Sequence, residues 1–179
     1  LPWGMFKVIR RDLLEKVNVQ FEGYSVGEEA IFSFEILRNA QNVKFADKVI
    51  YHYVQNSNGQ HTKGDKDPWH PMVTAMKNHL QEIGEYEKYK KSLNSLALKA
   101  ISIGMYRCTM NTNVTDAIKF MSNLHKEYSE EFDIKTFDKE SLDTATRCVL
   151  EMLNCKAYLL IYIASRLSLI HISEPTRPI

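Results

Sequence analysis

This 179-residue chain has few cysteines and almost no net charge. Its three cysteines, Cys108, Cys148 and Cys155, are too few and too scattered for a disulfide framework. We expect them to be buried and reduced, as in a cytoplasmic protein, with Cys148 and Cys155 on one helical face. The formal net charge is +1, so the charge balance requires neither nucleic acid nor an acidic membrane as a partner.

Several familiar signatures are also missing from the sequence. It contains no P-loop, no glycine-rich dinucleotide fingerprint, no Cys-x-x-Cys pair and no Gly-x-Ser-x-Gly. Nor is there an apolar run long enough to cross a membrane: residues 157–164 are apolar nearly all round, but a spanning helix needs about twenty residues. We expect a buried helix at residues 157–164.

The two ends of the sequence look unlike natural termini. There is no signal peptide, and the chain begins with Leu-Pro-Trp rather than Met, so we expect a fragment truncated upstream. Residues 167–177 look like the translation of a transposase adapter used to prepare DNA sequencing libraries. On that interpretation the natural protein stops near Arg166, and residues 167–179 are a non-native tail.

The first third of the chain predicts a small α/β piece. Residues 10–17 read as a short helix, and Ser25-x-x-Glu28 fits a capping box that begins a second helix over residues 28–39. The β-branched and aromatic residues of 43–45 and 49–54 predict two short strands.

The remainder of the chain predicts helices. A polar loop covers residues 56–67, and from Pro68 onward apolar residues recur at helical spacing. We expect about four helices, with Thr115 as a cap for the third and residues 139–166 as the fourth. The predicted organisation is therefore an α/β piece over residues 1–62 and a helical region over residues 63–166.

The order of five short segments resembles the catalytic domain of family 2 glycosyltransferases, bacterial enzymes that extend envelope and capsular polysaccharides. The segments are Pro2-Trp3-Gly4, Arg10-Arg11-Asp12-Leu13-Leu14, Phe21, Gly27-Glu28-Glu29 and Tyr51-His52-Tyr53. The resemblance implies the acceptor-side, C-terminal end of a GT-A (Rossmann-like) α/β domain. It also implies transfer of a sugar from a nucleotide-sugar to a glycan or lipid-linked acceptor, in the cytoplasm or at the inner face of the membrane.

The resemblance assigns roles to individual residues. Glu29 matches the carboxylate that takes the proton from the acceptor hydroxyl, and Glu28 matches the first residue of the acidic pair. Trp3, Gly4, Lys7 and Arg11 match the substrate-binding side. The family has Asp where this chain has Glu29, and the extra methylene moves the carboxylate by on the order of 1 Å, which can cost about a hundredfold in rate.

Two alternatives stay open at this level. Carboxylates in a first helical turn are favoured by the helix dipole and by capping, so the acidic pair could be purely structural. The whole chain could likewise be a non-catalytic helical interaction module. If the resemblance holds, peripheral membrane contact is open too, because such transferases often use lipid-linked acceptors.

We expect no metal site in this chain. Asp65-Lys66-Asp67 is a literal Asp-x-Asp, but it lies in a polar loop after the acidic pair, whereas the family's metal motif precedes its base. Histidines at positions 52, 61, 70 and 79 recur every nine residues, which matches no ligand spacing. The resemblance implies Mg²⁺ or Mn²⁺ for the complete enzyme, and we expect this chain alone to be inactive.

Overall fold

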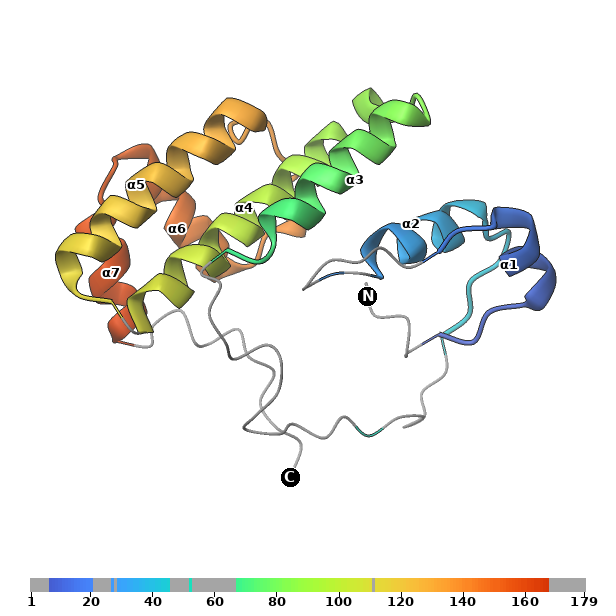
Figure 1. The fold of residues 1–179 in the computed structure, drawn as a ribbon, viewed down its shortest axis with the longest axis horizontal. Coiled ribbons are helices and arrows are strands. Elements are labelled where there is room, and N and C mark those ends of the chain that lie inside the picture. Colours follow the sequence, from blue (N-terminus) through green and yellow to red (C-terminus); the bar gives the residue numbers. More distant parts are fainter. Residues whose placement is uncertain are drawn as a thin grey trace.

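The protein is helical in the computed structural model, which describes residues 7–20, 27, 29–45, 52, 67–110 and 112–167. In chain order the elements are α1 (Arg11–Val17), α2 (Ala30–Asn39), α3 (His70–Glu82), α4 (Tyr86–Met110), α5 (Val114–Glu131), the 3₁₀ helix η3 (Lys139–Ser141), α6 (Thr144–Asn154) and α7 (Tyr158–Arg166) (Figure 1). These residues contain no strand.

The predicted α/β fold is therefore wrong for the part of the chain that can be compared. Residues 43–45 are irregular, and their apolar side chains are exposed: Val43 by 54% and Phe45 by 93%. Residues 49–54 lie outside the described residues except for His52. β-branched and aromatic residues favour a strand only where a neighbouring strand and a covering layer can pack on them. Residues 43–45 have neither among the described residues.

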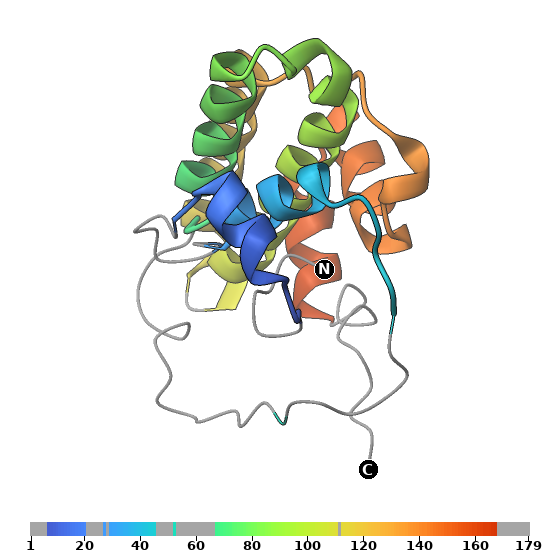
Figure 2. The ribbon, with the colours of Figure 1, turned by 90° about the vertical axis from the view of Figure 1, so that its right-hand side faces the viewer.

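The long helix α4 is the centre of a bundle. It packs against α3, α5, α6 and α7, which surround it in Figures 1 and 2. Its inward residues include Ala97, Ile101 and Met105, each fully buried. Their spacing of four residues places them on one stripe of the helix, which is the apolar periodicity that predicted helices in this region.

The N-terminal ends of α5 and α6 are set by polar caps. Asn113 accepts a hydrogen bond from the Asp116 amide at 3.0 Å and caps α5, so the predicted cap at Thr115 is wrong by two positions. Asp143 caps α6 through the Thr146 amide at 2.8 Å. Such side-chain acceptors satisfy amides that have no partner within the helix.

The predicted last helix over residues 139–166 is divided into η3, α6 and α7. The break between α6 and α7 follows Cys155 and includes Lys156, whose φ of 51° lies in the left-handed region and cannot continue a helix. The cysteines are only partly as predicted. Cys108 is buried as expected, but Cys148 and Cys155 are exposed, and all three are free thiols.

A smaller helical pair lies beside the bundle. Helix α1 packs on α2, and α2 packs on α3, so α2 joins the first part of the chain to the bundle (Figure 2). Gly27, just before α2, has a φ of 75°, and a side chain there would meet Cγ of Met72 at 2.9 Å. Glycine thus permits both the turn and the close approach of α2 to α3. None of the described helices is long and apolar enough to cross a membrane.

Candidate functional site

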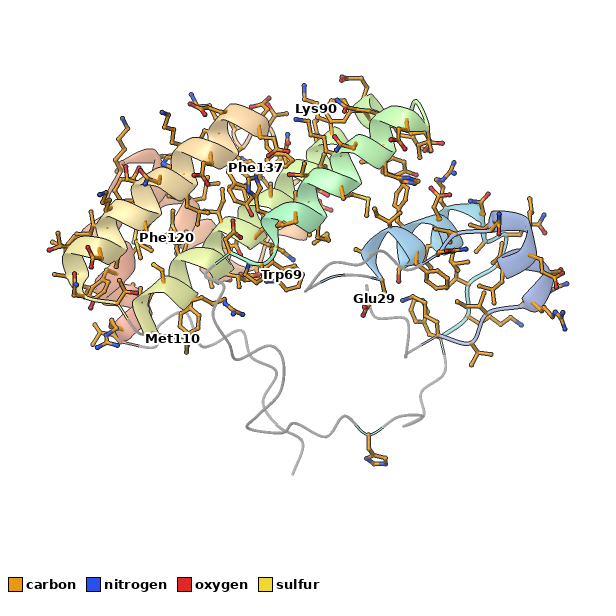
Figure 3. The ribbon with its side chains drawn as sticks, in the orientation of Figure 1. Glu29, Trp69, Lys90, Met110, Phe120 and Phe137 are labelled. Atoms are coloured by element: carbon orange, nitrogen blue, oxygen red, sulfur yellow. The ribbon has the colours of Figure 1, made fainter. Side chains whose placement is uncertain are left out.

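Glu29 lies at the N-terminal end of α2, on the side turned toward the bundle (Figure 3). Its backbone carbonyl accepts the Ser33 amide at 2.8 Å, but its side chain makes no capping hydrogen bond. The half-buried carboxylate is therefore not committed to closing the first turn of the helix. An acid at the start of a helix commonly accepts a hydrogen bond from a backbone N–H of the first turn, and the Glu29 side chain does not have that role.

Lys7 reaches the same turn of α2 from a distant part of the sequence. Its Nζ donates to Oγ of Ser33 at 3.1 Å, across 26 positions. Burial lowers the pKa of Lys7 below its ordinary value, and the negative charge of Glu29 offsets part of that shift. An ammonium and a carboxylate thus lie near each other at the head of α2.

A groove of about 380 Å³ runs between α1, α2 and the segment that follows α2. Its apolar lining comes from α1, α2 and the segments that precede α1 and follow α2, and includes the buried Ile36. Four cationic side chains line it as well: Lys7, Arg10, Lys16 and Lys44. The groove combines apolar and charged surface; Asp12 also lines it and pairs with Arg10, so the remaining excess of charge is cationic and favours an anionic ligand over a cationic one.

The basic residues at the start of α1 have different surroundings. Arg10 lines the groove and forms an ion pair with Asp12 at 2.6 Å. Arg11, the predicted substrate-binding residue, is not among the described residues that line the groove, and it pairs with Glu15 at 2.8 Å. The structure thus brings Lys7 toward Glu29 but places Arg11 apart from the groove. The remaining predicted residues, Trp3, Gly4 and Glu28, lie outside the described residues.

The sequence interpretation missed the polar network that holds α2 on the bundle. Glu35 is only 6% exposed and lies 2.7 Å from Arg38 and 2.8 Å from Nε2 of His79 on α3. Arg38 also pairs with Glu85, before α4, at 3.1 Å. The spacing of Glu35 and Arg38 is a recognisable helical ion pair. The contacts with His79 and Glu85 have no local sequence signal.

A second polar cluster joins α3 to α5. Nε2 of His70 lies 2.8 Å from Glu131, whose other carboxylate oxygen accepts from Thr74 at 2.8 Å. The His70 ring stacks on Tyr128 at 4.5 Å, and the Tyr128 hydroxyl donates to Asp67 at 3.2 Å. This cluster provides polar contacts that join α3, α5 and the segment before α3.

No metal-binding group is formed by the described residues, which hold no cluster of three histidine, cysteine or acidic side chains suited to an ion. Asp67, from the Asp-x-Asp sequence, accepts the Tyr128 hydroxyl, and Asp65 lies outside the described residues. His70 and His79 contact different acids, Glu131 and Glu35. Nine residues along a helix turn them to about opposite sides of α3.

No protein-family model, no curated protein and no solved structure matches this chain.

Proposed function

We propose that this chain provides the acceptor side of a nucleotide-sugar-dependent glycosyltransferase resembling family 2, with Glu29 as the general base. One observation carries the proposal: the side chain of Glu29 makes no capping bond, and its charge acts on Lys7, which lines the groove between α1 and α2. Glu29 does not itself line the groove among the described residues, but its charge acts on Lys7, which does, and its carboxylate has no capping role; this supports a chemical role over a purely structural one.

Glu29 and the lysines of the groove have different roles in the proposed reaction. Glu29 takes the proton from the acceptor hydroxyl while that oxygen forms a bond to the anomeric carbon. The bond from this carbon to the nucleotide phosphate breaks at the same time, and the electron pair leaves with the phosphate. General-base catalysis of this kind contributes about 10²–10⁴-fold. The ammonium groups of Lys7 and Lys16 attract the phosphate of a donor or of a lipid-linked acceptor.

The proposal derives no step through a metal ion. The described residues do not offer a fitting set of ligands, so Mg²⁺ or Mn²⁺, which the resemblance implies for the complete enzyme, has no assigned position in this chain. The proposed donor is a nucleotide-sugar and the proposed acceptor a glycan or a lipid-linked glycan. We place the reaction in the cytoplasm, where nucleotide-sugars are made.

The proposal is tested by assaying sugar transfer with the natural protein that carries this sequence. The donors are a panel of nucleotide-sugars, and the acceptors are extracted lipid-linked glycans. Glu29→Gln should lower kcat by about 10²–10⁴-fold without changing the thermal transition. Glu29→Asp restores the family's residue and should keep or raise activity. Glu15→Gln, which changes an exposed acid on α1, is the matched control and should be neutral. Full activity in Glu29→Gln would exclude Glu29 as the base.

A helical interaction module is the second candidate, and one observation favours it. Helix α7 presents Leu159, Leu160 and Ile163 to solvent, each at least 43% exposed, on the bundle side of the molecule. On this alternative Glu29→Gln changes no chemistry, and the bundle carries the function through its surface.

A further inference from the structure

The outer face of α7 is apolar along its whole length. Its exposed positions include Leu159 at 50%, Leu160 at 56% and Ile163 at 43%, and the next residue after the helix, Leu167, is 64% exposed. Ile161 and Ser165 face inward and are buried. The helix therefore has an inner face that packs on the bundle and an outer face without a covering element among the described residues.

The apolar surface continues onto the junction between α4 and α5. Nη1 of Arg166 donates to the carbonyl of Thr109 at 3.2 Å, which places the end of α7 beside the last turn of α4. Met110, labelled at that end of α4 in Figure 3, is 53% exposed, and Val114 at the start of α5 is 40% exposed. Two segments far apart in the sequence thus contribute to one exposed apolar surface.

The charged residues at the two ends of α7 are both cationic. Lys156 precedes α7 and Arg166 ends it, and both are exposed. Residues 155–167 contain no acidic residue. Tyr158 and Tyr162 are half-buried at the border of the face, where amphipathic aromatic rings often meet a membrane interface. Cations at both ends of an apolar face complement a surface that is negatively charged outside and apolar beneath.

We propose that this surface, which we call the α7 face (Leu159, Leu160, Ile163, Met110 and Val114), binds the surface of an anionic lipid bilayer. Helix α7 would lie in the interface with its leucines among the upper acyl chains, while Lys156 and Arg166 meet the headgroups. None of the described helices can span a bilayer, so the contact is peripheral. The inference goes beyond the proposed transferase function and does not rest on it.

The test is sedimentation of the 179-residue chain with large vesicles of phosphatidylcholine that contain about 30% phosphatidylglycerol. This anionic lipid content is on the order of that in natural membranes. Binding should fall as salt is raised from 50 to about 300 mM, because the attraction of Lys156 and Arg166 is screened. Pure phosphatidylcholine vesicles should bind more weakly. Equal binding to both vesicle types would overturn the anionic part of the proposal.

Matched substitutions locate the contact. Leu160→Gln with Ile163→Gln should lower vesicle partitioning by about tenfold, since two exposed side chains no longer enter the apolar layer. Val8→Gln with Val43→Gln removes comparable exposed apolar surface near α1 and α2 and should leave binding unchanged. Circular dichroism should show that both pairs keep the wild-type helix content.

Three results would overturn the proposal. The first is no sedimentation with anionic vesicles, and the second is binding that survives the Leu160→Gln and Ile163→Gln pair. The third is self-association in solution that this pair abolishes, which would assign the α7 face to a second copy of the chain. Glu29→Gln should bind vesicles like the wild type, so failure of the transferase proposal and failure of this one give different results.

Discussion

The carboxylate of Glu35 on α2 lies 2.8 Å from Nε2 of His79 on α3, although the two residues are 44 positions apart. Arg38 donates to the same carboxylate, and Phe34 meets the His79 ring edge-on at a centroid distance of 6.2 Å. This contact is the polar part of the joint between α2 and the bundle.

We expect this joint to weaken in acid. Burial alone would raise the pKa of Glu35, but hydrogen bonds from Arg38 and His79 outweigh it and hold the pKa below its ordinary value. The folded-state pKa is therefore lower than the unfolded one, near about 4.3. The stabilising contribution is fully present above the unfolded pKa and is lost as pH falls through the folded pKa.

Glu35→Gln tests this expectation. At pH 7 the substitution should lower the free energy of unfolding by about 1–3 kcal/mol, because buried hydrogen bonds to a charged group are replaced by weaker ones. The difference between wild type and variant should shrink below about pH 4, where the wild-type carboxyl is protonated too. Urea denaturation at a series of pH values measures both quantities. A difference that is constant from pH 7 to pH 3 would contradict the charged role of Glu35.

Gly27 gives a second prediction, with a control that the chain itself supplies. Gly27 and Gly84 have similar φ values of 75° and 70°, but a Cβ at Gly27 meets Met72 at 2.9 Å, while one at Gly84 meets nothing within 4 Å. Gly84→Ala should therefore report the backbone strain alone, about 1–2 kcal/mol. Gly27→Ala should cost roughly 1 kcal/mol more, because Met72 must also move.

A double-mutant cycle isolates the second contribution. In a Met72→Ala background, itself destabilised, Gly27→Ala should cost no more than Gly84→Ala does in the wild type. Thermal or urea unfolding of the four proteins gives the coupling energy. If Gly27→Ala is as mild as Gly84→Ala in the wild type, Gly27 is not a close-approach position between α2 and α3.

Local patterns in the sequence located most of the helices, but not the division of residues 139–166 into η3, α6 and α7 and not the contacts between helices. The predicted helices at residues 10–17 and 28–39 correspond to α1 and α2, since an apolar residue every three or four positions is a property of one short segment. Residues 43–45 were predicted as a strand from composition, yet a strand depends on a partner that local composition cannot specify.

The candidate site was also predicted only in part: single residues could be chosen from the sequence, but the contacts between segments could not. Glu29 and Lys7 were both singled out from their sequence context, whereas the hydrogen bond from Lys7 to Ser33 depends on how α2 approaches the preceding segment. The resemblance assigned substrate binding to Arg11 rather than to its neighbour Arg10. In the structure Arg10 lines the groove and Arg11 does not: Arg10 is the extended residue before α1, whereas Arg11 is the first residue of the helix and pairs with Glu15.

Tyr128 provides a prediction for the alkaline range. Its ring is fully buried, and burial, together with the nearby charge of Asp67 and the hydrogen bond to it, raises the pKa of the phenol far above its ordinary value. A group whose folded-state pKa is raised contributes stability below its unfolded pKa, about 10, and loses it as pH rises further. The wild type should therefore lose stability above about pH 10 in part through Tyr128.

Tyr128→Phe separates this effect from other alkaline transitions. At pH 7 the variant should be less stable by about 1–2 kcal/mol, because the hydrogen bond to the Asp67 carboxylate is lost. Between pH 9 and 11 its stability should fall less than that of the wild type. Tyr162→Phe, at a half-buried tyrosine of α7, is the control and should follow the wild-type slope. Parallel slopes for all three proteins would contradict the burial of an un-ionised phenol.

The charge of Glu29 should be measurable through Lys7. Burial lowers the pKa of Lys7, and the Glu29 carboxylate raises it part of the way back. Glu29→Gln removes the negative charge and should lower the pKa of Lys7 further, as followed by NMR of its Cε and Nζ nuclei. On α4, the pKa of Lys88 is raised by Tyr89 and Glu85. Glu85→Gln should lower the pKa of Lys88, and neither substitution should act on the other lysine. A Lys7 titration unaffected by Glu29→Gln would mean that the two groups do not interact, which would remove the observation on which the proposed base depends.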